Sequence, residues 1–169
     1  GHSQSSPCGC GQCNLFSGHA FQNALGATAL AATQDSIISD EEQKKLIQQG
    51  LRLVAMHEVG HTLGLRHNFK GSSVASLDQI NSKKNVSRRS ATTSVMDYVP
   101  VNIVPKGSFQ GPYYPTRLGP YDYWAIDYGY RPISGTTPKA ERPTLLKIAS
   151  RSGESQLAFA TDEDTTAGD

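Results

Sequence analysis

Three of the five histidines in this 169-residue chain fall within the eleven residues HEVGHTLGLRH, which occupy positions 57–67. His57 and His61 are four residues apart, so on a helix both side chains project from the same face. Two imidazole nitrogens on one face can bind a single ion, and zinc accepts neutral histidine nitrogen at about 2.0–2.1 Å. The spacing therefore predicts a helix that carries two zinc ligands.

A third ligand, His67, requires a change in chain direction. Six residues beyond His61, a straight helix would have rotated by about 600° and would place His67 on its far side. Gly64 lies between the two histidines, and glycine tolerates the positive φ of a sharp bend. We expect a bend at Gly64 that returns His67 to the ion bound by His57 and His61.

Glu58 is the candidate general base. Three protein ligands leave one position of a tetrahedral zinc ion open for water, which is the catalytic rather than the structural pattern. Glu58 lies about 100° round the helix from His57 and can reach that water without being a ligand. Zinc lowers the pKa of the water toward about 7, so Glu58 can take its proton and pass it to a leaving amine.

The alternative interpretation is that these are surface histidines, or core histidines satisfied by hydrogen bonds. That alternative would be serious for HExxH alone. Five fixed positions within eleven residues, however, arise by chance in well under about one chain in a thousand of this length.

One long helix over residues 39–64 should position the first two histidines. Ser39 and Glu42 have the spacing of a capping box, and the first turn is acidic. Gly64 suits a left-handed C-terminal cap. Gly50 weakens the middle by roughly 1 kcal/mol, so a break there is an alternative. The apolar residues 51–56 predict that the second half is buried.

The remaining elements are expected to be short and joined by polar loops. They are an amphipathic helix over 17–36 that buries Phe21, Leu25, Ala29 and Ala32, a short helix within 74–80, a helix from Pro120 to a stop at Gly129, a helix over 139–148 and a strand over 156–161.

Composition excludes some functions. The net charge is +1 with balanced acids and bases, which argues against a nucleic-acid groove or a membrane-surface patch. No apolar run approaches the length of a membrane-spanning helix, and the first residues do not resemble a signal peptide. For Cys8, Cys10 and Cys13 we favour one local disulfide plus a remaining thiol, with metal binding as the alternative.

The motif HEVGHTLGLRH resembles the extended zinc signature H-E-x-x-H-x-x-G-x-x-H of the metzincin metallopeptidases. This resemblance implies a tight Met-turn beneath the metal, for which Met96 in SVMDY is the candidate. In the astacin and serralysin branches a tyrosine two residues further on lies near the zinc. Tyr98 occupies the corresponding position here. Its role could be that of an extra zinc ligand, of a hydrogen-bond donor to the oxyanion, or of an aromatic side chain that only packs.

A wider resemblance covers roughly residues 50–130 and the stretch LAFATDED. Together with HEVGHTLGLRH, the stretches SVMDY and LGPYDYWAIDYGY are similar to a family of large bacterial zinc-dependent metalloproteases, mostly predicted to be exported. The resemblance implies an α+β fold with a metzincin-like zincin core. Metzincins usually carry a mixed β-sheet before the zinc helix, whose edge strand binds the peptide. Upstream of residue 39 we find no convincing strand, so we expect a helix-rich core whose N-terminal mixed sheet is reduced or missing.

We expect a single catalytic domain, or a fragment of one, over residues 1–169. Its parts are a Cys-rich loop and helix (1–38), the zinc helix and third ligand (39–68), a loop, Met-turn and C-terminal helix (69–131), and a tail (132–169).

The leading functional hypothesis is a zinc-dependent endopeptidase, a hydrolase whose cofactor is Zn²⁺ and whose partner is a protein or peptide substrate. An exported location, in the periplasm, on the cell surface or outside the cell, follows from the resemblance alone. Three alternatives are another zinc amide hydrolase or exopeptidase, a non-catalytic zinc-binding module, and an inactive fragment of an active enzyme.

Overall fold

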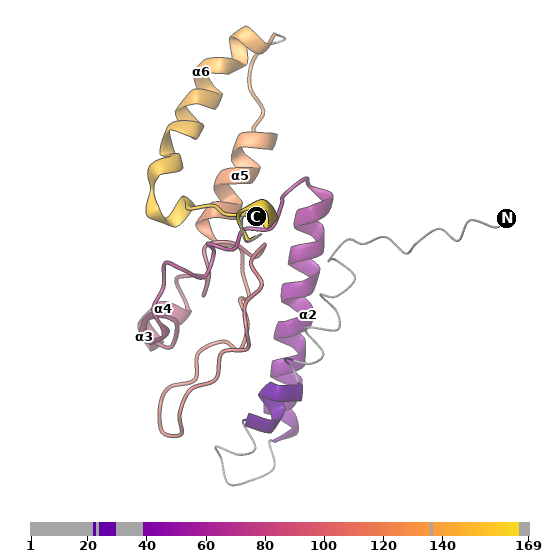
Figure 1. Ribbon diagram of the computed structural model, residues 1–169, viewed down its shortest axis with the longest axis vertical. Coiled ribbons are helices and arrows are strands. Elements are labelled where there is room, and N and C mark those ends of the chain that lie inside the picture. The colour runs from indigo at the N-terminus through magenta and orange to yellow at the C-terminus, as the bar shows by residue number, and fades with distance from the viewer. Residues whose placement is uncertain (1–21, 23, 30–38, 136, 166–169) are drawn as a thin grey trace, which may run out of the picture.

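The computed structural model describes residues 22, 24–29, 39–135 and 137–165 (Figure 1). These residues form α-helices, 3-10 turns and loops, and no β-strand occurs among them. The helix-rich character of the expected α+β core is therefore present, whereas its sheet is not seen in the described part. None of the described helices has both the length and the apolarity needed to cross a membrane. The three cysteines lie outside the described residues.

The longest element is α2, which runs without interruption from Asp40 to Thr62. Ser39 caps it, because its hydroxyl accepts a hydrogen bond from the backbone N–H of Glu42 at 3.2 Å. Only half of the expected capping box forms, since the Glu42 carboxylate instead accepts a hydrogen bond from the Tyr113 hydroxyl. The alternative of a break at Gly50 is wrong, because Gly50 is a buried residue inside the helix.

The expectation that the second half of α2 is buried holds for one face only. Leu53 and Val54 are buried, whereas Leu51 and Ala55 are exposed. An exposed apolar row at four-residue spacing follows the other side of the helix through Ile47, Leu51, Ala55, Val59 and Leu63. High local apolarity therefore overestimated burial, because among the described residues the packing partners of α2 lie mainly on the face turned toward residues 95–114.

The core lies between α2 and the extended segment that contains residues 95–114 (Figure 1). Gln49 on α2 fixes this segment, since its side-chain oxygen accepts hydrogen bonds from the backbone N–H groups of Tyr113 and Tyr114 at 2.7 and 3.3 Å. The fully buried cluster consists of Leu46, Leu53, Val95, Met96, Tyr113 and Tyr114.

The loop after the third histidine carries two single-turn helices, α3 (Leu77–Ile80) and α4 (Lys83–Val86). The predicted short helix within 74–80 is therefore present, and a second one follows it. Helices α5 (Pro120–Tyr130) and α6 (Pro138–Ala149) pack together, with Trp124 Nε1 donating to the carbonyl of Ile148 at 2.8 Å. The predicted stop at Gly129 is wrong by one residue, because α5 continues to Tyr130.

Two other predictions are corrected. The strand expected over 156–161 does not form: Gln156 and Leu157 belong to a 3-10 turn, and a loop follows. Residues 22 and 24–29 are helical as expected, but Leu25 is 49% exposed, whereas Gly26 is buried against Val101 and Leu46. The face of this helix that carries Gly26 packs against the core, because glycine allows a closer approach than leucine. Phe21 and Ala32, also expected on the buried face, lie outside the described residues.

Candidate metal centre

The structure brings His57, His61 and His67 together. One possible ligand atom from each lies within 4.8 Å of those of the other two, and their ring centroids are 4.7–5.4 Å apart. Gly64 adopts a φ of 82° just beyond the end of α2, and the N–H of Leu65 turns back to the carbonyl of Gly60 at 3.0 Å. The bend at Gly64 therefore returns His67 to the helical pair, as its spacing required.

Backbone carbonyls orient the two helical imidazoles. Nδ1 of His57 lies 2.9 Å from the carbonyl oxygen of Val95, and Nδ1 of His61 lies 2.9 Å from that of Leu65. A carbonyl oxygen only accepts, so each Nδ1 carries the hydrogen that it donates. A neutral imidazole with its hydrogen on Nδ1 has a free lone pair on Nε2. Both Nε2 atoms are buried without a hydrogen-bond partner.

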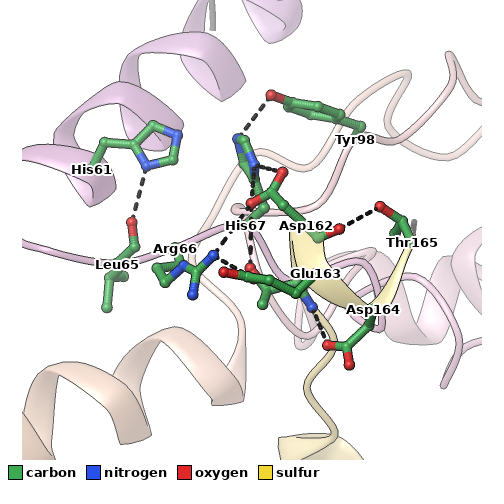
Figure 2. Close-up of polar contacts among 10 residues, drawn as sticks. His61, Leu65, Arg66, His67, Tyr98, Asp162, Glu163, Asp164 and Thr165 are labelled. Atoms are coloured by element: carbon green, nitrogen blue, oxygen red, sulfur yellow. Dashed lines mark hydrogen bonds and ion pairs between the residues drawn. The ribbon is translucent and has the colours of Figure 1, made fainter. Parts of the chain in front are cut away.

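His67 is oriented by a carboxylate. Its Nδ1 lies 2.9 and 3.1 Å from the two carboxylate oxygens of Asp162, and its Nε2 lies 2.8 Å from the Tyr98 hydroxyl (Figure 2). In a neutral ring with its hydrogen on Nδ1, Nε2 is the acceptor and the phenol hydroxyl donates to it. Residue type and spacing do not single out Asp162, which is 95 residues away from His67. The only signal was its position within the stretch LAFATDED.

Tyr98, a candidate catalytic residue, has its hydroxyl at the histidine cluster. Its ring also stacks on His57, with centroids 5.5 Å apart. Partial burial, followed by the negative charges of Asp162 and Glu58, raises the pKa of Tyr98. The hydroxyl is therefore protonated at neutral pH and available as a hydrogen-bond donor.

Glu58 is exposed on α2 beside the buried His57. Burial lowers the pKa of His57, and the Glu58 charge acts in the opposite direction more weakly. The charge of Glu58 is thus felt by both His57 and Tyr98. Glu58 is thus exposed to solvent at the position in α2 that follows the first histidine.

Met96, the candidate for the Met-turn, is fully buried in the core cluster. Its side chain lies directly against α2, because a Cβ placed on Gly60 would come within 2.4 Å of the Met96 sulfur. Its carbonyl accepts a hydrogen bond from the N–H of Asn68 at 3.0 Å. Met96 therefore joins the helix that carries the first two histidines to the residue that follows the third.

Asp122 holds the turn around Met96 in place. Its buried carboxylate accepts hydrogen bonds from the Ser94 hydroxyl at 2.7 Å, the N–H of Val95 at 3.0 Å and the N–H of Gly119 at 2.8 Å. The carbonyl of Val95 in turn orients His57. Sequence reasoning missed Asp122. The one indication in the sequence was that Asp122 lies in LGPYDYWAIDYGY, a stretch that carries the family resemblance, but nothing in that stretch pointed to a role for the aspartate.

Comparison with known protein families identifies the family of this chain. A family model described as Met-zincin matches residues 39–169, which include all three histidines, Glu58 and Met96. No curated protein and no solved structure shows significant similarity to the chain. Since the match spans more than half of the sequence, the chain belongs to the Met-zincin family.

Proposed function

We propose that this Met-zincin chain is a zinc-dependent endopeptidase. The observation that best supports a metal site is the pair of buried Nε2 atoms of His57 and His61, which lack hydrogen-bond partners and have His67 beside them. A buried polar atom without a partner costs about 1–3 kcal/mol, so two that face a third imidazole favour a shared cation. Three neutral imidazoles form a ligand set typical of catalytic zinc, and the family to which the chain belongs implies the same metal.

The proposed reaction is hydrolysis of a peptide bond. Bound zinc would supply a Lewis acid that polarises the peptide carbonyl and makes water more acidic. Glu58 takes one proton from the attacking water as the new C–O bond forms. It then delivers that proton to the nitrogen as the C–N bond breaks, which gives a carboxylic acid and an amine. The second proton of the water then passes from the acid to the amine, so the final products are a carboxylate and an ammonium group. The exposed position of Glu58 suits this transfer, because water and substrate both arrive from solvent.

Tyr98 is proposed to stabilise the negative charge that develops on the carbonyl oxygen. Its hydroxyl already lies at the histidine cluster, and its raised pKa keeps the proton in place. A donor aimed at the developing oxyanion contributes typically about 2.7–4 kcal/mol to transition-state stabilisation. Tyr98→Phe should therefore lower kcat with little change in zinc content.

The test measures zinc content and cleavage together. The unmodified chain should bind about one zinc ion, His61→Ala should lose it, and Glu58→Gln should keep zinc but lose cleavage of casein. Glu41→Gln is the matched control, because Glu41 is exposed in the first turn of the same helix. Cleavage by Glu58→Gln at the unmodified rate would refute the role of Glu58, and a chain that takes up no zinc would refute the site.

A peptide blocked at both ends separates the proposed function from its rivals. An endopeptidase cleaves an interior bond of that peptide, whereas an exopeptidase or a small-amide hydrolase leaves it intact. Zinc binding without any cleavage would favour a non-catalytic module or an inactive fragment. An exported location is part of the proposal, and fractionation of expressing cells would test it.

A further inference from the structure

The segment 158–164 returns to the metal centre from the far end of the described chain. The carbonyl of Ala160 accepts from the N–H of Phe69 at 2.8 Å. The buried Asn68 side chain donates to the carbonyl of Ala158 at 3.1 Å and accepts from the N–H of Ala160 at 3.3 Å. These contacts attach the segment to the two residues that follow His67.

The attachment presents Asp162 to His67 (Figure 2). The Asp162 carboxylate is steadied by the Thr161 hydroxyl at 3.3 Å, while the N–H of Thr161 donates to Asp164 at 2.8 Å. Beside it, Arg66 forms an ion pair with Glu163 and a longer one with Asp162, at 3.9 Å. Both partners of the Arg66–Glu163 pair are more than half exposed, so that pair adds little to stability by itself.

The three histidines are therefore oriented by different chemistry. His57 and His61 donate to neutral carbonyls that belong to nearby structure, whereas His67 donates to a carboxylate. A carboxylate partner fixes the ring orientation and the Nδ1–H tautomer, and it makes the opposite nitrogen more basic. The third histidine would be the one most dependent on a residue outside the zinc motif.

We propose that Asp162 is a positioning residue of the metal centre and that segment 158–164 exists there to deliver it. This inference rests on the proposed zinc site. Loss of such an outer partner typically weakens metal affinity by about 10–100-fold, because the ligand loses orientation and basicity.

The experiment compares zinc dissociation constants, measured by competition with a chromophoric chelator, among four full-length chains. Asp162→Ala should weaken zinc binding by about 10–100-fold. Asp162→Asn should weaken it less, because the amide oxygen still accepts from Nδ1–H. Glu163→Gln is the matched control, since it removes a neighbouring carboxylate and the pair with Arg66 but leaves the contact to His67. Its affinity should stay within about twofold of the unmodified chain.

A second measurement reads the orientation directly. Long-range ¹H–¹⁵N spectra of the imidazoles should report the Nδ1–H tautomer of His67 in the unmodified chain and in Glu163→Gln. Asp162→Ala should show a mixture of tautomers. A protein in which Asp162 merely holds the fold together would lose stability without this change at His67.

Each of three possible results would refute either the proposed function or the role of Asp162. If the unmodified chain takes up no zinc, the proposed function fails. If it binds zinc and Asp162→Ala binds equally tightly, the inference alone fails. If Glu163→Gln loses as much affinity as Asp162→Ala, the effect belongs to attachment of the segment and not to the Asp162 carboxylate.

Discussion

Gly60→Ala should destabilise the protein because the Met96 side chain occupies the space that a methyl group would need. The new Cβ would lie 2.4 Å from the Met96 sulfur and 3.4 Å from its terminal carbon. Favourable contacts between such atoms require about 3.5–4.0 Å, so the sulfur must move by roughly 1 Å or more. Met96 is fully buried in the core, so this movement displaces its neighbours.

The expected magnitude combines two terms of opposite sign. Overpacking a core costs about 1–3 kcal/mol, and the severe overlap here places the cost in the upper half of that range. Alanine regains up to about 1 kcal/mol of helix propensity over glycine. The net loss in the free energy of unfolding should be about 1–2 kcal/mol, which corresponds to a fall in Tm of roughly 2–8 °C.

Urea denaturation of four variants tests this reasoning. Gly129→Ala is the matched control, since Gly129 also lies in a helix but a Cβ there meets no atom within 4 Å. That variant should be unchanged or gain up to about 1 kcal/mol. Met96→Ala should itself cost about 2–5 kcal/mol, but adding Gly60→Ala to it should then be neutral or stabilising. If Gly60→Ala alone is as stable as the unmodified protein, the close packing of Met96 against α2 is refuted.

Three further predictions concern stability. Asp122→Ala should lower the free energy of unfolding by about 3 kcal/mol or more, because it leaves three hydrogen-bond donors without their acceptor; an unchanged urea midpoint would contradict this. Burial raises the pKa of Tyr114 and of Tyr121 to about 12. Above about pH 10 the unfolded chain releases protons that the folded protein keeps, so the urea midpoint should fall between about pH 10 and 12, and a flat profile would refute the burial argument. Removing zinc with a chelator should lower the Tm of the unmodified chain but not that of His61→Ala. A ligand present at 100 times its Kd adds about 2.7 kcal/mol to the free energy of unfolding. Equal Tm shifts in the two proteins would exclude metal binding at the histidines.

The parts of the site that depend on local spacing could be predicted from the sequence. The i, i+4 relation of His57 and His61 and the conformational freedom of Gly64 are properties of a few consecutive residues, and they suffice to bring His67 back. The residues that orient the histidines could not be predicted in this way. Asp162 and Asp122 act across 95 and 27 residues, and neither periodicity nor residue type indicates such a contact.

The incorrect predictions of burial and of a strand have a related cause. The stretch after Gly50 is apolar, but burial depends on which face meets residues 95–114, so Leu51 remains exposed while Leu53 is buried. The stretch QLAFAT has the alternation of a strand. In the structure its backbone instead bonds the side chain of Asn68 and the N–H of Phe69, and no strand lies beside it in the part of the chain that the structure describes.

The separation of 95 residues between His67 and Asp162 also sets an order of events on the ribosome. Translation adds about 5–20 residues per second, so the carboxylate is polymerised on the order of 5–20 s after the histidine that it orients. Throughout that interval the nascent chain holds the whole HEVGHTLGLRH motif without the partner of its last histidine. The centre can therefore be completed only after the ribosome has added the 95 residues that separate His67 from Asp162.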